Sequence, residues 1–192
     1  MGRVARPVVA VVIGILVLGA CQREEQRPVT PATTPAPQVV DPGTLTAGDR
    51  ISAPKGKVVL TMTGAIEAHN QGKKLALDLA SLERMRTVRM ELNEPFLKRR
   101  MTFEGVLLAD LLTVAGVPET AKKVQITALD DYKVEFTMAD VRDSKMLLAT
   151  RADGQPMPID KAGPIRIVFP DGSSLGRNPD LWIWSVNAMK VS

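Results

Sequence analysis

The chain has 192 residues, of which 45% are hydrophobic, and this is enough for one domain with its own core. Its net charge is +4 at pH 7 with both signs interspersed, which argues against a nucleic-acid-binding surface. One cysteine and one histidine exclude an internal disulfide and disfavour a metal site built from these two residue types.

Residues 1–20 have the pattern of an export signal peptide. Arg3 and Arg6 precede the apolar run PVVAVVIGILVLGA, which is short for a bilayer crossing. The sequence LGAC, which ends at Cys21, resembles the lipobox of bacterial lipoproteins and implies cleavage before Cys21 and lipidation of that residue. Because acyl chains contribute ~0.8 kcal/mol per buried methylene, we expect a stable lipid anchor in the bacterial cell envelope, facing the periplasm. An uncleaved membrane helix, or a secretory signal with a spare thiol, is the alternative.

Residues 21–56 read as a tether that follows the lipidated cysteine. The stretch QREEQRPVTPATTPAPQVVDPGT is rich in Pro, Thr and Gln and poor in large apolar side chains. Such a composition favours extended chain and cannot bury enough surface to offset the entropy of ordering. The folded domain is therefore predicted over residues 57–192.

The first half of this domain mixes strands with helices. KVVLTMTG predicts a strand that ends at Gly64, KLALDLASLERM a strand running into a short helix, and TVRMELN another strand. FEGVLLADLLTVAGVP is the clearest predicted helix, with Gly116 at its C-terminal cap and Pro118 blocking continuation. Its apolar face consists of Leu107, Leu108, Leu111, Leu112 and Ala115.

The second half is rich in strand signals. VQITAL, YKVEFT, KMLLATR and PIRIVFP predict strands, with turns at DGQP and DGSS. In the closing run DLWIWSVNAMKVS, Trp182 and Trp184 are predicted to share one face of a strand, because side chains at i and i+2 point the same way. Short strands with a few interleaved helices indicate an α+β domain, and no G-x-G-x-x-G or phosphate-loop pattern is present.

No local motif specifies an enzyme. His69 lies in the polar, turn-like stretch GAIEAHNQGKK, and Ser173 and Ser174 follow the turn signal DG rather than a G-x-S-x-G pattern. The carboxylates are numerous, but the sequence places none of them in a convincing acid–base pair.

The ordered set of segments FEGVLLADLLTVAG, ALDDYKVEFTMAD, LLATRADGQPM, KAGPIRIVFP and LWIWSVNAMKV resembles the molybdopterin-binding domain of the sulfite oxidase family. The similarity is greatest to short, stand-alone, exported members, and it covers residues 57–191. The resemblance implies a mixed α+β fold with a cleft that accommodates a pterin.

One departure from the family pattern changes what the resemblance implies. Enzymes of this family bind molybdenum through a cysteine in the strand before the LL-rich helix, a position that falls here at or near Met90. A thioether carries no charge and is a poor ligand for a hard, oxo-bearing metal. Cysteine-less exported relatives are pterin-binding proteins that control inner-membrane enzymes of cyclic di-GMP turnover. The resemblance therefore favours a bound pterin over a redox cofactor such as molybdopterin, with no metal.

Aromatic candidates for pterin contact come from two segments. Trp182 and Trp184 offer surfaces for stacking, and Phe96 offers an opposite wall; each has a place in the core as its alternative.

Polar candidates are spread along the chain. Asp131, which with Tyr132 matches an Asp-Tyr pair of the family, suits the N–H edge of a pterin, unless an Asx-type turn uses it. Arg151 and Arg177 offer cations at the cleft mouth, with solvated positions as their alternatives. Asn93 and Glu94 are weaker candidates.

Three functions remain open from the sequence. The first is a membrane-tethered pterin sensor or adaptor without catalysis, acting on an inner-membrane signalling protein. The second is a molybdopterin-dependent oxidoreductase with atypical metal ligation. The third is a lipoprotein with a vestigial cleft that acts through surface contacts alone.

Overall fold

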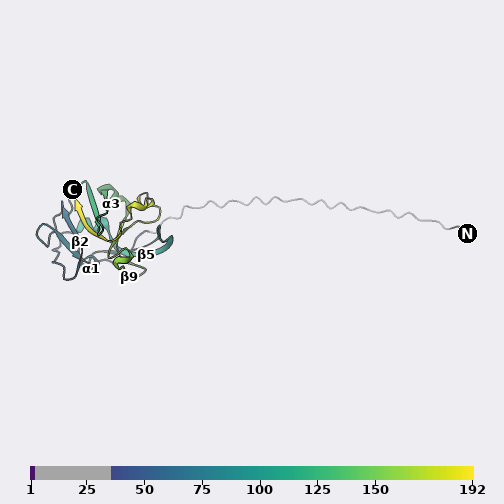
Figure 1. Cartoon of the computed structure of the whole chain (residues 1–192), viewed down its shortest axis with the longest axis horizontal. Coiled ribbons are helices and arrows are strands. Elements are labelled where there is room, and N and C mark those ends of the chain that lie inside the picture. Colours follow the sequence, from purple (N-terminus) through teal and green to yellow (C-terminus); the bar gives the residue numbers. More distant parts are fainter. Residues whose placement is uncertain (3–35) are drawn as a thin grey trace. The chain divides into compact units, whose positions relative to one another are not determined.

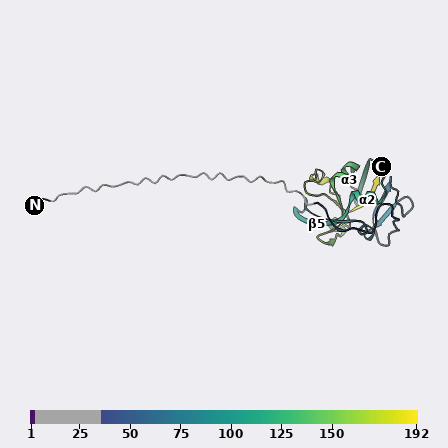
Figure 2. The same ribbon diagram turned by 180° about the vertical axis from the view of Figure 1, so that it is seen from behind.

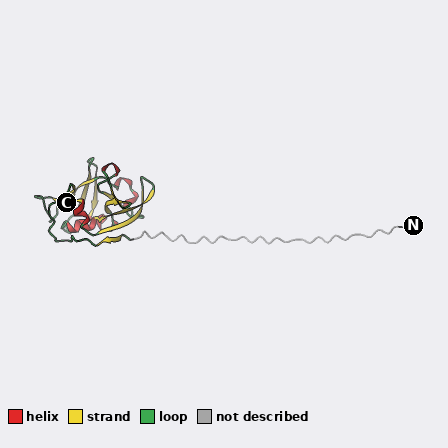
Figure 3. Ribbon diagram, turned by 90° about the horizontal axis from the view of Figure 1, so that it is seen from below, coloured by secondary structure: helices red, strands yellow, loops and turns green. Residues whose placement is uncertain are grey.

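A computed structural model describes residues 1–2 and 36–192 of the chain. The predicted lipid anchor Cys21, most of the predicted signal peptide and the first part of the predicted tether lie outside the described residues. Strands dominate the folded unit and form two sheets connected by short helices (Figure 3). Among the helices of the described segments, none is both long and apolar enough to cross a membrane.

The first sheet carries the hairpin that later forms part of the site. Its strands are, in spatial order, β1 (Gln38–Asp41), β4 (Thr87–Glu94), β5 (Arg99–Leu107), β8 (Leu147–Ala152) and β10 (Arg166–Val168), with the short β9 (Gln155–Pro156) paired to β8. All of these pairs are antiparallel. Along β4 every second residue is buried, so that Val88, Met90, Leu92 and Glu94 all face the interior.

The second sheet has the C-terminal strand at its centre. Its spatial order is β3 (Leu75–Asp78), β2 (Val58–Gly64), β11 (Val186–Val191), β6 (Lys123–Ala128) and β7 (Lys133–Thr137). β11 runs parallel to β2 and antiparallel to β6, and Figure 1 shows it in yellow near β2. The other two pairs are antiparallel.

The helices are short and locally capped. They are α1 (Leu79–Glu83), α2 (Leu108–Val114) and α3 (Met138–Ser144), with 3₁₀ turns η1 (Ile159–Lys161), η2 (Leu175–Arg177) and η3 (Pro179–Leu181). The Asp78 side chain caps α1, and Thr137 with Asp140 forms a capping box on α3. Figure 2 shows α2 and α3 as neighbours, and they contact each other.

The predicted α+β fold class is confirmed, together with the strands KVVLTMTG, TVRMELN and VQITAL. The helix predicted over FEGVLLADLLTVAGVP is wrong in its first part, because Phe103–Leu107 belongs to β5. Pairing with β4 and β8 outweighs the local helical spacing of the leucines. Gly105 permits this pairing, since a Cβ atom there would overlap the carbonyl oxygen of Leu148.

The folded unit also begins earlier than the predicted boundary at residue 57. β1 pairs with β4, and the backbone N–H groups of Thr44 and Leu45 donate to the carbonyl of Arg84. Leu45 and Ile51 are 3% and 6% exposed, so this segment contributes to the core. These buried apolar residues were not predicted, because the segment around them is rich in proline.

The two tryptophans precede β11 and do not share a strand face, which corrects the prediction. Their segment crosses between the sheets: Ile167 N–H donates to the Ile183 carbonyl, and Leu129 N–H donates to the Ser185 carbonyl. This irregular path buries Trp182, at 6% exposure, and leaves Trp184 42% exposed.

Candidate functional site

A cleft of about 610 Å³ opens beside the tip of the β4–β5 hairpin. Its walls come from this hairpin, from the β8–β9 turn, from the loop that contains η1, and from the segment before β11. Binding-relevant lining residues are Glu94, Leu97, Met101, Met157, Arg166 and Trp184. The cleft volume falls within the range of about 300–1,000 Å³ that is usual for small-molecule sites.

The η1 loop is shaped by a close internal contact. Gly163 N–H donates to the Pro158 carbonyl at 3.0 Å, and a Cβ atom on Gly163 would overlap the carbonyl oxygen of Met157. Glycine therefore allows the loop to fold back on itself and to present Met157 and Ile159 to the cleft.

A buried ion pair lies at the cleft. Arg166 on β10 is 4% exposed and Glu94 at the end of β4 is 1% exposed, and Arg166 Nη2 donates to Glu94 Oε1 at 2.8 Å. Burial lowers the pKa of Arg166 from its ordinary value, whereas Glu94 opposes that shift. A pair this deeply desolvated is maintained only where other hydrogen bonds satisfy the charged groups.

The guanidinium of Arg166 lies over two aromatic rings, and its buried Nε–H has no hydrogen-bond partner among the described residues. Its Cζ is 5.5 Å from the ring centroid of Phe103 and 5.2 Å from that of Trp184. Its Nε is buried and donates to no acceptor within the described part of the chain. A buried unpartnered N–H beside a cleft is a donor available to a ligand.

The second oxygen of Glu94 holds the hairpin tip. Oε2 accepts the backbone N–H of Phe96 at 2.8 Å and that of Leu97 at 2.6 Å. Lys98 follows with φ of 52°, in the left-handed region, and completes the turn into β5. One carboxylate thus connects the buried arginine to the exposed turn.

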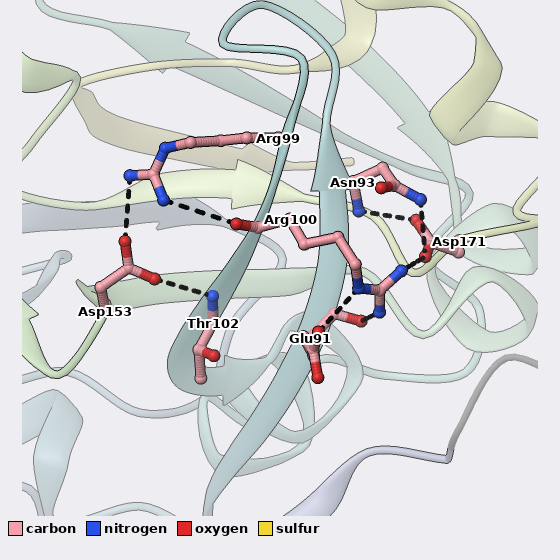
Figure 4. Close-up of polar contacts among 7 residues, drawn as sticks. All are labelled: Glu91, Asn93, Arg99, Arg100, Thr102, Asp153 and Asp171. Carbon is pink, nitrogen blue, oxygen red and sulfur yellow. Dashed lines mark hydrogen bonds and ion pairs between the residues drawn. The ribbon is translucent and has the colours of Figure 1, made fainter.

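The strands of the hairpin are held from both sides close to the tip (Figure 4). Arg99 pairs with Asp153 on the β8–β9 turn at 3.0 Å, and Asp153 also accepts the backbone N–H of Thr102. On the other side Arg100 pairs with Glu91 at 2.7 Å and with Asp171 at 3.0 Å. These exposed pairs fix the hairpin where it leaves the sheet.

Three of the predicted aromatic residues line a second, smaller hollow of about 320 Å³, and of these only Trp184 also lines the cleft. The Phe96 ring packs edge-on against Trp184, with ring centroids 4.9 Å apart. The Tyr132 hydroxyl donates to the Asp180 carbonyl at 2.9 Å. The three side chains are between 42% and 45% exposed, so their faces are available for contact.

Trp182 lies in the core, which was the alternative to ligand contact. Its Nε1 donates to the Gly176 carbonyl at 2.9 Å, and its ring packs against Phe169 with centroids 5.7 Å apart. Only Trp184 of the pair therefore lines the larger cleft.

The predicted polar residues lie elsewhere. Asp131 is exposed, with φ of 66°, in the β6–β7 turn, where Asp130 makes the Asx-type contact by accepting the Tyr132 N–H at 3.1 Å. Arg151 pairs with Glu83 at 2.8 Å, away from the cleft. Arg177 is exposed in η2 and does not line the cleft.

The two residues that the structure brings together were a weak prediction in one case and none in the other. Glu94 stood only as a weaker candidate, and Arg166 was hidden in the apolar strand PIRIVFP. A signal for Arg166 existed, because a charge in the middle of a buried strand is rare unless it is paired. Its partner lies 72 positions away, which no local pattern reveals.

A second cleft of about 530 Å³ lies on the other side of η1 and shares Ile159 with the first. Its lining is mostly apolar and includes Asn187, whose buried Oδ1 accepts no hydrogen bond from the described residues.

Comparison with known families identifies this arrangement. The family described as "Oxidoreductase molybdopterin binding domain" matches residues 69–177, which is more than half of the chain. The chain belongs to this family. The matched range contains the hairpin, Glu94, Arg166 and the η1 loop that form the cleft.

A solved structure supports the fold. The sulfane dehydrogenase SoxCD from Paracoccus pantotrophus is similar, with a TM-score of 0.53 and 21% sequence identity. The similarity covers 69% of this chain and 37% of that chain, so this protein corresponds to little more than a third of that neighbour. No curated protein sequence matches the chain.

The family implies a molybdenum cofactor, and the described residues lack the thiolate that would bind its metal. The described ranges contain no cysteine, so no thiolate is present there to bind molybdenum. Met90, near which the lost cysteine was placed, is buried in the core and does not line the cleft, where β4 presents Glu94. Within the described residues no cluster of three or more His, Cys, Asp and Glu side chains is arranged to hold a metal ion.

Proposed function

We propose that the chain is a lipid-anchored pterin-binding protein of the bacterial envelope that reports the occupancy of its cleft to a signalling partner and performs no catalysis. The observation that carries this proposal is the free, buried Nε–H of Arg166 beside the exposed face of Trp184. Together they offer a hydrogen-bond donor and a stacking surface at one cleft.

A pterin matches these features chemically. It is a flat heteroaromatic ring with carbonyl and ring-nitrogen acceptors, which suit Arg166 Nε, and a face that suits Trp184. Stacking of a base on an aromatic side chain, a fair analogue, is worth ~1–3 kcal/mol. Glu94 already balances the charge of Arg166, so the pair favours a neutral acceptor over an anionic group.

The lack of a thiolate separates this proposal from catalysis. An oxidoreductase with atypical molybdenum ligation is the second candidate, because the family is described as one of oxidoreductase domains. The cleft side of β4 offers a carboxylate that already accepts three hydrogen bonds, and such a group is poorly free to bind a metal.

The N-terminal sequence supports attachment of the chain to a membrane. A lipid on Cys21 followed by a proline-rich segment would keep the domain near the membrane and raise its effective concentration toward a membrane protein. We propose an inner-membrane protein of cyclic di-GMP turnover as the partner. Co-purification of such a protein with the chain, enhanced by added pterin, would support this part of the proposal.

Titration of the purified protein with pterin (2-amino-4-oxopteridine) tests the proposal, with quenching of the ligand's fluorescence as the signal. We expect saturable binding by the native sequence and weaker binding by Trp184→Ala. The matched control is Arg151→Ala, since Arg151 pairs with Glu83 outside the cleft. Absence of binding, or molybdenum in elemental analysis of protein from its native envelope, would contradict it.

A further inference from the structure

Glu94 connects the ligand-facing arginine to the hairpin tip through its two carboxylate oxygens. In the structure Oε1 accepts from Arg166 Nη2, and Oε2 accepts from the N–H groups of Phe96 and Leu97. One oxygen of the carboxylate therefore binds the buried Arg166, and the other binds the exposed turn.

A second arrangement is available to the same three groups. Nε–H and Nη2–H of an arginine lie on one edge of the guanidinium and match the two oxygens of a carboxylate. If Oε2 of Glu94 left the tip amides, it could accept from the free Nε of Arg166. The released N–H groups of Phe96 and Leu97 would then meet water, because both residues are exposed.

The two arrangements leave different donors without a protein partner. The observed one leaves Arg166 Nε unpartnered in a buried position, which is unfavourable. The alternative gives Nε a partner but leaves the tip amides without one. A ligand atom that accepts a hydrogen bond from Nε gives it a partner in the observed arrangement. Such a ligand therefore stabilises the observed arrangement and not the alternative.

We propose that occupancy of the cleft orders the hairpin tip at residues 95–98 through Glu94. With the cleft filled, Oε2 stays on the tip amides and Phe96 remains against Trp184; with the cleft empty, Glu94 turns to Nε and the tip is released. The inference rests on the proposed function, since it needs a ligand that carries an acceptor, such as the 4-oxo group of a pterin.

The surroundings confine the movement to the tip. In the strands next to the tip Asn93 donates its backbone N–H to Asp171 at 2.8 Å, and Thr102 donates to Asp153 at 3.0 Å (Figure 4). Both anchors belong to segments outside the hairpin. The strands stay paired while the turn, which carries the exposed Phe96 and Leu97, changes its order.

Amide hydrogen exchange of the whole protein, with and without saturating pterin, tests the inference. We expect exchange at Phe96 and Leu97 to slow by about 5- to 150-fold on binding, the usual range of coupling between two sites. The amides of Asn93 and Thr102 serve as internal controls and should not change. In the variant Glu94→Asp the shorter side chain cannot reach both partners, so the protection of Phe96 and Leu97 that pterin adds should be lost.

The outcomes separate the two proposals. Pterin binding by fluorescence with unchanged exchange at Phe96 and Leu97 would overturn the inference and leave the proposed function standing. Equal slowing at Asn93 and Thr102 would also overturn it, because it would indicate general stabilisation. No pterin binding at all would overturn both.

Discussion

The two tryptophans provide a matched pair of substitutions that separates stability from binding. Trp182 is 6% exposed, donates to the Gly176 carbonyl and packs on Phe169. Removing a buried aromatic ring of this kind costs ~3–5 kcal/mol. We therefore expect Trp182→Ala to lower the free energy of unfolding by about that amount and to change pterin affinity little in the fraction that remains folded.

Trp184→Ala should lower pterin affinity more clearly than it lowers the free energy of unfolding. Its ring is 42% exposed and makes one edge-on contact with Phe96 and one cation–π contact with Arg166. These contacts are worth ~0.5–1.5 kcal/mol and ~0.5–2 kcal/mol respectively. The loss of stacking should weaken pterin binding by ~1–3 kcal/mol, or about 5- to 150-fold.

Urea unfolding and pterin titration of both variants measure the two quantities. Each variant keeps one tryptophan as a fluorescent reporter, because the chain contains two. Stability that falls equally in both variants with unchanged affinity would indicate a vestigial cleft. Weaker binding in Trp182→Ala than in Trp184→Ala would refute the assignment of Trp184 to the ligand.

Three further predictions address the buried pair, pH and the anchor. Glu94→Leu or Arg166→Met alone should destabilise the protein by ~3–5 kcal/mol, whereas the double variant should cost less than either single one in urea unfolding; a simple sum would argue against coupling. The hydroxyl and N–H of Ser81 and the N–H of Gly56 lower the pKa of Asp78 from 3.8 to about 2, so ionised Asp78 contributes about 2 kcal/mol above pH ~4, lost as the pH falls through 2. Unfolding measured from pH 5 to 2 should be less pH-dependent in Asp78→Asn, and an unchanged slope would show that Asp78 does not cause it. Cys21→Ala should release the protein from membranes on fractionation, and retention in the membrane fraction would remove the lipid-anchor assignment.

The sequence predicted strands well where buried and exposed side chains alternate, as in β4, β6 and β7. It failed where long-range pairing decides the local structure, as at Phe103–Leu107, which belongs to β5 although the leucines that begin at Leu107 have helical spacing. It also missed β1, whose pairing with β4 depends on a strand about 50 residues away. Periodicity describes a segment by itself and contains no information on its neighbours.

The residues of the candidate site were likewise predictable only where local sequence determines their position. Phe96 and Trp184 were predicted from residue type and adjacency to predicted elements, and they do contact each other. Arg166 and Glu94 come from different strands, and only the register of the first sheet brings them within 2.8 Å. Asp131, Arg151 and Arg177 were chosen for their charge, but their backbone positions direct them elsewhere.

Mass spectrometry can identify the small molecules released from the protein after mild purification from its native envelope. We expect a metal-free pterin in near-stoichiometric amount from the native sequence, and less of it from Trp184→Ala. A molybdopterin released with equimolar molybdenum, or the absence of any pteridine from protein shown to be folded, would contradict the proposed function.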